Sequence, residues 1–326
     1  MDDSDQNCPL SELALQIAKD ELREDEKTRK FALEQMREWI RKNPRIIFCR
    51  TDNSFLFRFL RVKKFSIPIA QETLEKYLLL RHAFGHLMFH NLDIKNPVME
   101  ELLSLGYLFV APKRDKNGRR IIIARPGVFD PYKFTNQDMC HIHAITYETL
   151  MEDEENQVFG YVHFADGVGF SFPHLTLFTP KEAVRIVKNG ERIIPMRHKE
   201  VHGINAPAGL KYVIDFGMSL VSEKIRKRVK IYNNLDELHK HIDRSLLPKE
   251  YGGEMPMAEM IDLWRKELLK YRDVLLTNDK MSVRLDMYSE AAKEGSVSAL
   301  KSGCGIGAKK EGVDYVTGSF RQLAVD

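Results

Sequence analysis

VFGYVHFADG, residues 158–167, is the stretch that decides the fold class. Successive side chains of a β-strand point to opposite faces of the sheet, so residues two apart share a face. The stretch fits this period from Tyr161 to Asp166. We therefore expect a strand with Tyr161, His163 and Ala165 on one face and Val162, Phe164 and Asp166 on the other.

Helical and strand-like segments alternate on both sides of this strand. One helix is expected to begin at Thr135 and to end in the acidic run MEDEEN. Another is expected at residues 179–182, where Thr-Pro-Lys-Glu forms a capping box with proline at the first helical position. Upstream, the apolar runs YLFVAP and IIIARP flank the turn dipeptide Asn117-Gly118, a pattern typical of a hairpin.

Two further strands are expected downstream, KEVHGINAP at residues 199–207 and VKIY at residues 229–232. Strands that alternate with helices form layers in which a mostly parallel sheet is covered by helices. The sequence therefore predicts an α/β fold with a mostly parallel sheet flanked by helices.

The first ninety or so residues carry a helical pattern instead. Apolar residues recur at helical intervals in residues 12–22 and 26–42, and Asn43-Pro44 stops the second helix. FLFRFLRVKKF follows at residues 55–65, with caps available in residues 52–54. We expect an all-helical N-terminal region.

Residues 208–231 join a short apolar helix to a basic one. The apolar helix, 208–221, is hydrophobic nearly all round, which implies burial or contact with lipid, yet a membrane span needs roughly 20 residues. The basic helix, SEKIRKRVK, begins at a cap formed by Ser222. Two interpretations remain open: a core helix followed by a solvated basic helix, or a lid over a hydrophobic cavity that opens onto an anionic membrane. For a lid, the gate residues are Leu210, Val213, Phe216 and Leu220.

The composition is typical of a globular protein. Charged residues make up 30% and hydrophobic residues 43%, too polar a mixture for a membrane-embedded chain. The net charge is only +3, so we expect no nucleic-acid partner, and anion binding must depend on local clusters. The start MDDSDQ lacks a signal-peptide pattern, and the four scattered cysteines form neither a disulfide framework nor a zinc spacing. The expected location is the cytoplasm, a reducing compartment.

Motifs for catalysis and metal binding do not appear in the sequence. It contains no HExxH, GxSxG or GxxxxGK pattern. His141 with His143, and His239 with His241, are two residues apart on predicted helices and therefore point to different sides. The glycine-rich run at 303–307 follows no strand. We expect no enzyme activity, no catalytic residue, no cofactor and no metal site.

Five segments together resemble one family. FLFRFLRVKKF, GYLFVAP, FGYVHFADGVGF, VHGINAP and LPKEYGG have the order and approximate spacing of the CRAL-TRIO lipid-binding proteins, over roughly residues 45–255. The likeness is strongest to the branch that contains α-tocopherol transfer protein, cellular retinaldehyde-binding protein and the clavesins. It implies an N-terminal helical domain (1–94), a lipid-binding domain that encloses an apolar cavity (95–256) under a gate (208–221), and a C-terminal helix (257–275). Residues 276–326 have no counterpart and are expected to form a flexible tail.

The resemblance also implies a basic cleft for phosphoinositide headgroups. The family positions fall on residues that are all basic in this chain: Lys63, Arg197, Lys199, Lys224 and Arg228. Cations that converge from separate segments suit a phosphate, because each charge-assisted hydrogen bond is modest alone. The alternative is that they are solvated surface charges. Arg58 and Arg61 lie on the same helix as Lys63, but each can instead pair with an acidic neighbour.

Positions that match ligand contacts of the family supply an expected cavity lining. It consists of Cys140, His143 and Tyr147 on the helix after Thr135, Tyr161, His163 and Ala165 on the strand, and Ile186 on the capped helix. The histidines and tyrosines are more polar than the tocopherol binder of the family generally is at these places. Buried polar groups need hydrogen-bond partners, so they either satisfy one another or meet a polar end of the ligand. A retinoid, carotenoid or sterol-like lipid with a hydroxyl or carbonyl end stays open.

Three functions compete. The leading one is a cytosolic lipid-binding and transfer protein that sequesters a small hydrophobic ligand, tocopherol-, retinoid- or carotenoid-like, and exchanges it at phosphoinositide-containing membranes. The second is a clavesin-like trafficking adaptor that binds phosphoinositides and a partner protein. The third, an enzyme acting on a lipid, lacks a catalytic motif. The expected partners are therefore a hydrophobic small molecule and the anionic surface of endosomal or plasma membranes, to which attachment is transient and peripheral.

Overall fold

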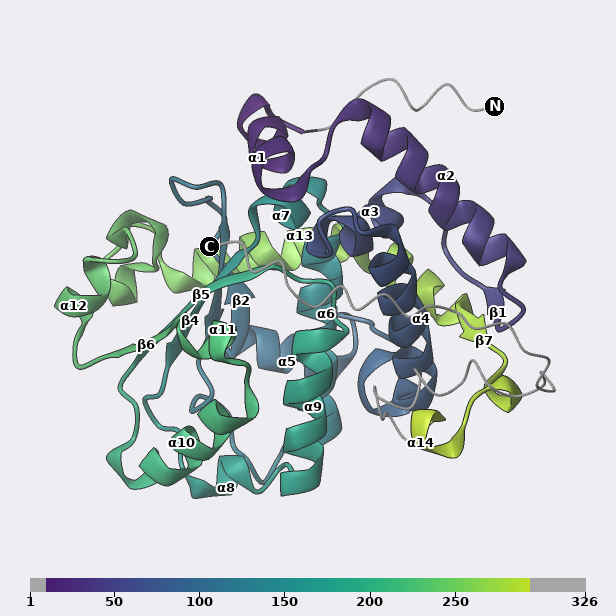
Figure 1. Ribbon diagram of the computed structural model, residues 1–326. Helices are drawn as coiled ribbons and strands as arrows, with labels where there is room; N and C mark the ends of the chain where they lie inside the picture. Colours follow the sequence, from purple (N-terminus) through teal and green to yellow (C-terminus); the bar gives the residue numbers. More distant parts are fainter. Residues whose placement is uncertain (1–9, 294–326) are drawn as a thin grey trace.

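A five-stranded sheet forms the centre of the fold (Figure 1). The structure is a computed structural model, and it describes residues 10–293 apart from five side chains, those of residues 185, 188, 189, 210 and 211. The strands lie in the order β2-β3-β4-β5-β6. β2 and β3 are antiparallel, and the other three pairs are parallel. The bounds are β2 Leu108–Val110, β3 Arg120–Ala124, β4 Tyr161–Asp166, β5 His198–Ile204 and β6 Val229–Tyr232. The expected α/β fold with a mostly parallel sheet is confirmed.

β4 lies in the middle of the sheet, where its alternating sequence fits best. His163 lies in register with Ile122 of β3 and Val201 of β5. The strand begins directly after Gly160, which has a φ of +81°, a conformation that favours glycine. A Cβ at this position would lie 2.4 Å from the carbonyl oxygen of Arg197, so the glycine lets the start of β5 approach β4 closely.

Helices cover the sheet, and two of them begin at the capping signals of the sequence. α6 (Asn136–Met151) follows Thr135, which shares reciprocal hydrogen bonds with Asp138. α9 (Pro180–Arg192) follows Thr179. The remaining helices of this part are α5 Pro97–Ser104, α7 Glu154–Phe159, α8 Phe172–Leu175, α10 Lys211–Leu220, α11 Glu223–Arg226, α12 Leu235–His239 and α13 Met257–Thr277. Among the residues that the structure describes, no helix is both long and apolar enough to cross a membrane.

Helices make up most of the N-terminal part, but the expectation of an all-helical region is wrong at the short strand β1 (Ile46–Phe48), which pairs with a strand from the end of the described chain. The helices are α1 Glu12–Leu22, α2 Glu26–Lys42, α3 Asn53–Val62, α4 Ile67–Ala83 and the short π-helix η2 Gly85–Phe89. Two buried arginines of α3 form ion pairs with acidic residues of other elements. Arg58 pairs with Glu148 of α6, and Arg61 pairs with Glu24 and Glu154. Both arginines therefore form the pairs with acidic neighbours that the sequence left open.

The chain beyond α13 returns to the N-terminal part. β7 (Ser282–Val283) pairs antiparallel with β1 (Ile46–Phe48), and α14 (Glu290–Lys293) packs against α4. The expectation of a flexible tail from residue 276 is therefore wrong for residues 276–293, because this segment is hydrogen-bonded and packed. The rest of that expected tail, residues 294–326, lies outside the described residues.

Candidate ligand cavity and basic cluster

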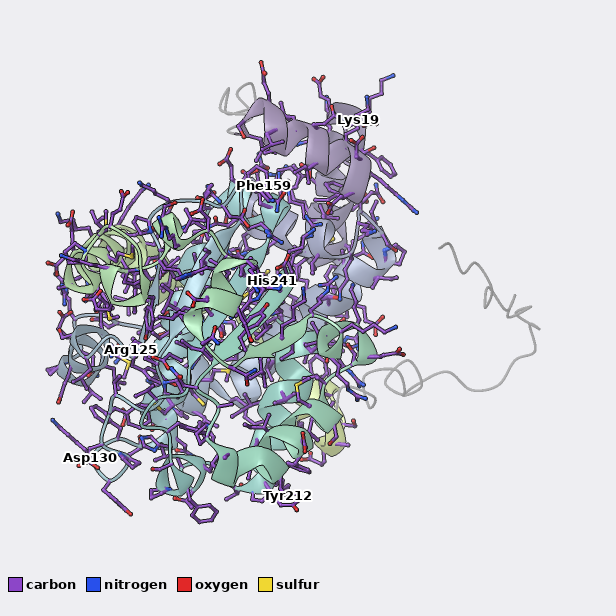
Figure 2. All side chains as sticks on the ribbon, turned by 90° about the vertical axis from the view of Figure 1, so that its left-hand side faces the viewer. Lys19, Arg125, Asp130, Phe159, Tyr212 and His241 are labelled. Carbon is purple, nitrogen blue, oxygen red and sulfur yellow. The ribbon has the colours of Figure 1, made fainter. Side chains whose placement is uncertain are left out.

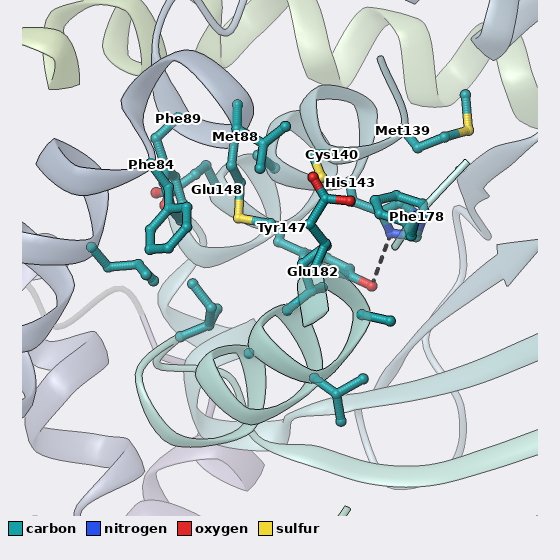
Figure 3. Close-up of a pocket in the computed structure, with 18 of the residues that line it drawn as sticks. Phe84, Met88, Phe89, Met139, Cys140, His143, Tyr147, Glu148, Phe178 and Glu182 are labelled. Atoms are coloured by element: carbon teal, nitrogen blue, oxygen red, sulfur yellow. Dashed lines mark hydrogen bonds between the residues drawn. The ribbon is translucent and has the colours of Figure 1, made fainter. Parts of the chain in front are cut away.

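An apolar cavity of about 460 Å³ lies between the end of α4, η2, α6 and α9 (Figure 3). This volume is typical of sites that enclose a small organic molecule. Most of the wall is apolar and is supplied by Leu80, Phe84, Met88, Phe89, Met139, Ala144, Met151, Phe178, Ala183, Ile186, Val187 and Ile194. Because these residues come from both the N-terminal helices and the helices beside the sheet, both parts of the chain build the site.

Three polar side chains form one patch of the lining, here called the polar wall: Tyr107, His143 and Tyr147. The Tyr107 hydroxyl lies 2.9 Å from Nε2 of His143. The Tyr147 hydroxyl lies 3.2 Å from Nδ1 of the same ring, and Figure 3 marks this hydrogen bond with a dashed line. A neutral imidazole donates from one nitrogen and accepts at the other. One tyrosine therefore donates to the ring while the other accepts from it, and the accepting tyrosine keeps a hydroxyl proton that is not used by the ring. With either tautomer, the polar wall can donate one hydrogen bond to an oxygen atom in the cavity.

Burial keeps the polar wall uncharged. It lowers the pKa of His143 to about 4 and raises the pKa of Tyr147 to about 12. It also raises the pKa of Tyr107 above its ordinary value. All three groups are neutral at pH 7, so the wall suits a neutral polar group such as a hydroxyl or a carbonyl better than an ion.

The lowered pKa of His143 makes stability depend on pH. Below the ordinary pKa of 6.5, the unfolded chain protonates this imidazole, whereas the folded protein keeps it neutral until the pH nears 4. The unfolded state binds more protons in this window, so the free energy of unfolding falls as the pH is lowered from about 6.5 to about 4. We expect His143 to account for a loss on the order of 3 kcal/mol. Chemical denaturation of ligand-free protein across this range checks it: His143→Phe should flatten the curve, and an unchanged slope would contradict the assignment.

Two more of the expected residues, Cys140 and Ile186, also line the cavity. Burial raises the pKa of the Cys140 thiol to about 12, so the thiol stays protonated and unreactive at neutral pH.

Two carboxylates, Glu148 and Glu182, reach the wall as well, and both accept hydrogen bonds from the protein. Glu182 accepts from the backbone amide of Thr179 at 2.8 Å, which is part of the capping box of α9. Glu148 accepts hydrogen bonds from Arg58 at 3.0 Å and from the Tyr77 hydroxyl at 2.5 Å. It therefore belongs to the packing between α3, α4 and α6 rather than to an open anionic site.

The strand residues expected in the lining lie elsewhere. His163 sits behind the polar wall: its ring centroid is 6.3 Å from that of Tyr147, and its Nε2 is 2.9 Å from Nδ1 of His198. Tyr161 is buried at the start of β4, where its hydroxyl donates to a backbone carbonyl near the end of α6 at 3.3 Å. Like Ala165, these two residues are outside the described cavity lining. Direct contact of all three with a ligand stays a prediction.

The apolar segment expected to act as a gate consists of the 3₁₀-helix η3 (Ala208–Leu210) and α10. α10 packs against α9, which supplies one wall of the cavity, but the described side chains of α10 do not line the cavity. Val213 and Phe216 are 37% and 48% exposed, and Leu220 is half-buried. The side chain of Leu210 lies outside the described part. The contact of α10 with the cavity is therefore indirect, through α9.

The five basic residues expected to bind a headgroup, here called the basic cluster, lie together in the fold. They are Lys63 after α3, Arg197 and Lys199 at the start of β5, Lys224 in α11 and Arg228 before β6. Burial lowers the pKa of Lys63, and the charge of Lys224 contributes. Burial also lowers the pKa of Lys224, followed by the charges of Arg228, Lys64 and Arg197. Cations of separate segments are thus close neighbours, an arrangement that suits a polyanion.

Two groups at these sites were not expected from the sequence. Tyr107 completes the polar wall, and a polar aromatic at the start of a buried apolar run is the signal that points to it. Glu21 of α1 accepts a hydrogen bond from Lys199 Nζ at 2.8 Å, and nothing in its surrounding sequence marks it. Within residues 10–293, no group of three or more His, Cys, Asp or Glu side chains is arranged to hold a metal ion.

A helix-covered sheet with an apolar cavity is the architecture of a protein that encloses a small lipophilic molecule. Residues 105–253 match the family described as CRAL/TRIO domain. The chain is 32% identical over 250 residues to "Alpha-tocopherol transfer protein-like" of Homo sapiens, covering 76% of this chain and 71% of that protein. It is 31% identical over 250 residues to "Clavesin-1" of Xenopus laevis, covering 76% and 75% respectively. The chain belongs to the CRAL-TRIO family, as the five segments of its sequence predict.

The family is one of lipid-binding proteins and not of enzymes. Among solved structures, "Crystal structure of Sfh5" aligns with 80% of this chain and 98% of its own, with a TM-score of 0.49 and 13% identity. The membership of the CRAL-TRIO family makes lipid binding the general activity to which the cavity belongs.

Proposed function

We propose that the protein is a cytoplasmic carrier that sequesters one small hydrophobic molecule and exchanges it at phosphoinositide-containing membranes. The observation that carries this proposal is the cavity of about 460 Å³, whose lining is mostly apolar and is polar at the polar wall and at two hydrogen-bonded carboxylates, Glu148 and Glu182. An apolar occupant gains about 25 cal/mol for each Å² of apolar surface that it removes from water, which favours a lipid over a polar metabolite here. Exchange would take place during transient, peripheral attachment to endosomal or plasma membranes.

The proposed ligand is a long apolar molecule with one neutral polar end, tocopherol-, retinoid- or carotenoid-like. Its hydroxyl or carbonyl oxygen would accept the hydrogen bond that the polar wall has left to donate. The name of the relative "Alpha-tocopherol transfer protein-like" supports a ligand of this general kind. The histidine and two tyrosines of the polar wall support one whose polar end is recognised by hydrogen bonding.

His143→Phe should change which lipid the protein holds. The substitution removes the ring that positions both hydroxyls, and an unpaired polar end of the ligand costs about 1–3 kcal/mol, which is about five- to 150-fold in affinity. Organic extraction and mass spectrometry of the purified variants measure the lipid profile. Tyr288→Phe is the control, because it removes a buried hydroxyl that donates to Glu75 outside the cavity lining and should leave the profile unchanged. Identical profiles for His143→Phe and wild type would remove the polar wall from ligand recognition.

Exposed apolar side chains on α8 and α10 support a membrane-facing surface. Phe172 is 65%, Tyr212 88% and Phe216 48% exposed, and both helices lie at the lower end of the molecule in Figure 1. Figure 2 shows Tyr212 directed outward at that end. Exposed apolar residues grouped in this way mark surfaces that meet another apolar phase. Together with the basic cluster they would combine shallow insertion with attraction to anionic lipid.

Phe172→Asp combined with Phe216→Asp should weaken binding to phosphatidylinositol bisphosphate vesicles by about tenfold or more, because two charges would enter the interface in place of two rings. Vesicle co-sedimentation measures the effect. Phe31 of α2 is 57% exposed and provides the control, since Phe31→Asp adds a charge at a distant apolar site. Equal binding of the double variant and the control would show that the α8–α10 surface does not face the membrane.

A clavesin-like phosphoinositide-binding adaptor is the second candidate. It is favoured by the longer alignment with "Clavesin-2" of Homo sapiens, 29% identical over 286 residues that cover 87% of this chain and 86% of that protein. Extraction and mass spectrometry of protein purified from its native source separates the two. A stoichiometric lipid supports the carrier, whereas an empty cavity combined with tight headgroup binding supports the adaptor and overturns the carrier.

A further inference from the structure

α1 is held against the rest of the molecule by a small apolar contact of its own. Its residues pack with α7 in a cluster separate from the main core, composed of Leu10, Ala14, Ala18, Leu22, Val158 and Phe159. Figure 2 shows Phe159 close to the end of the molecule where Lys19 of α1 lies. Four α1 side chains take part in this contact, and two of them are alanines, which bury little apolar area; the others are Leu22 and the partly buried Ile17. Next to Glu21, Leu22 is fully buried and Glu24 pairs with the buried Arg61, so the backbone at the end of α1 is anchored while the exposed side chain of Glu21 is free to turn.

Glu21, in the last turn of α1, reaches from this helix into the basic cluster. Its carboxylate accepts a hydrogen bond from Lys199 Nζ at 2.8 Å and another from the Arg197 guanidinium. Partial burial alone would raise the pKa of Glu21, but the hydrogen bonds and charges of Lys199 and Arg197 hold it below its ordinary value. The side chain is still 45% exposed. A carboxylate thus occupies the place between two cations that a phosphate oxygen could take.

The other cations of the basic cluster have no such partner. Within residues 10–293, Lys63, Lys224 and Arg228 form no ion pair, and the guanidinium of Arg228 donates to a backbone carbonyl of β5 instead. Each of the other acidic groups nearby has a partner outside the basic cluster. Glu72 pairs with Lys76, Glu24 pairs with Arg61, and Glu191 accepts a hydrogen bond from the backbone amide of Ser222. One carboxylate therefore neutralises part of the cluster and leaves the rest with an excess of positive charge.

We propose that Glu21 is an internal competitor for the headgroup site, and this rests on the proposed binding of phosphoinositides to the basic cluster. In the free protein its carboxylate occupies the Arg197–Lys199 position. A headgroup phosphate carries a charge of about −1.5 to −2 and three acceptor oxygens, so it displaces a single carboxylate from two cations. The displaced Glu21 turns toward solvent, and the end of α1 loses its tie to β5. Glu21 therefore lowers the affinity of the basic cluster for a phosphoinositide.

The comparison of Glu21→Gln with Asp20→Asn tests the proposal. Both substitutions remove one negative charge from the same turn of α1, but Asp20 only pairs with Gln16 on the outer side of the helix. Binding is measured to phosphatidylcholine vesicles that contain a phosphatidylinositol bisphosphate, and to soluble inositol trisphosphate and inorganic phosphate. We expect Glu21→Gln to tighten binding of the bisphosphate vesicles and of inositol trisphosphate by about three- to tenfold, and Asp20→Asn to change it by less than about twofold. A gain with inorganic phosphate alone would identify a free anion site and overturn the headgroup assignment.

The double variant Arg197→Ala with Lys199→Ala tests the headgroup site separately from the competitor role of Glu21. If this double variant binds inositol trisphosphate as wild type does, the proposed headgroup site is wrong whatever Glu21 does. If the double variant binds weakly while Glu21→Gln matches Asp20→Asn, the headgroup site stands and the competitor is wrong.

Discussion

Arg58→Ala is expected to lower the free energy of unfolding by about 3–5 kcal/mol. Arg58 is fully buried and donates to Glu148 at 3.0 Å and to Glu152 at 2.8 Å. Without the guanidinium, two carboxylates remain in the interior with part of their compensation removed, and their desolvation is no longer offset. Since Glu148 also forms part of the cavity lining, the same substitution should reduce the amount of lipid that the protein retains.

Chemical denaturation of Arg58→Ala and Arg41→Ala provides the measurement and its control. Arg41 lies on α2 with 73% of its side chain exposed and has only a long contact of 4.0 Å with Glu38. An exposed pair of this kind contributes about 0–1 kcal/mol. A loss for Arg58→Ala as small as that for Arg41→Ala would mean that water or a local rearrangement compensates the buried carboxylates. The attachment of α3 to α6 would then rest on apolar packing alone.

Reversal of two charges in the basic cluster is expected to have the largest effect on membrane binding. Lys63→Glu with Lys224→Glu should weaken binding to phosphatidylinositol bisphosphate vesicles by about a hundredfold or more. Each position loses a charge-assisted contact worth about 1.5 kcal/mol and gains repulsion from the headgroup. Because these residues are accessible to solvent, the attraction that remains in wild-type protein should also weaken with added salt.

The control for this reversal changes the same number of charges at another place. Lys266 and Lys270 are exposed on α13, so Lys266→Glu with Lys270→Glu alters the net charge equally without touching the basic cluster. Vesicle co-sedimentation and thermal unfolding are measured for both double variants. If the two double variants lose binding equally while remaining folded, attraction depends on overall charge, and the basic cluster is only a solvated positive surface.

Local patterns of the sequence were sufficient to predict the helices and the strand that lie around the cavity. The alternation in β4, the cap at Thr135 and the capping box at Thr179 each depend on neighbouring residues, and each element forms where its pattern predicts. The short strands β1 and β7 could not be found in this way. Their three and two residues are too few to show a period, and their pairing joins distant parts of the chain.

The sequence predicted which face of a strand a side chain occupies better than it predicted how close that side chain lies to the cavity. The period of a strand assigns Tyr161 and His163 to one face, but it does not say how far each lies from the neighbouring helices. In the fold, His163 sits behind Tyr147, while Tyr161 lies beside the end of α6. The contact of Glu21 with Lys199 could not be predicted for a similar reason. An acidic residue near the end of an amphipathic helix looks the same in the sequence whether its side chain faces solvent or two cations.

Release of the native lipid to acceptor vesicles tests the carrier function most directly. Ala183→Phe narrows the cavity, and Ala258→Phe adds the same bulk to the exposed surface of α13. We predict that wild-type protein and Ala258→Phe carry a stoichiometric lipid and release it about tenfold faster into vesicles that contain a phosphatidylinositol bisphosphate, whereas Ala183→Phe carries far less. Equal lipid content in Ala183→Phe and wild type, or a release rate that does not depend on the bisphosphate, would contradict a carrier that holds its ligand in this cavity and delivers it at phosphoinositide membranes.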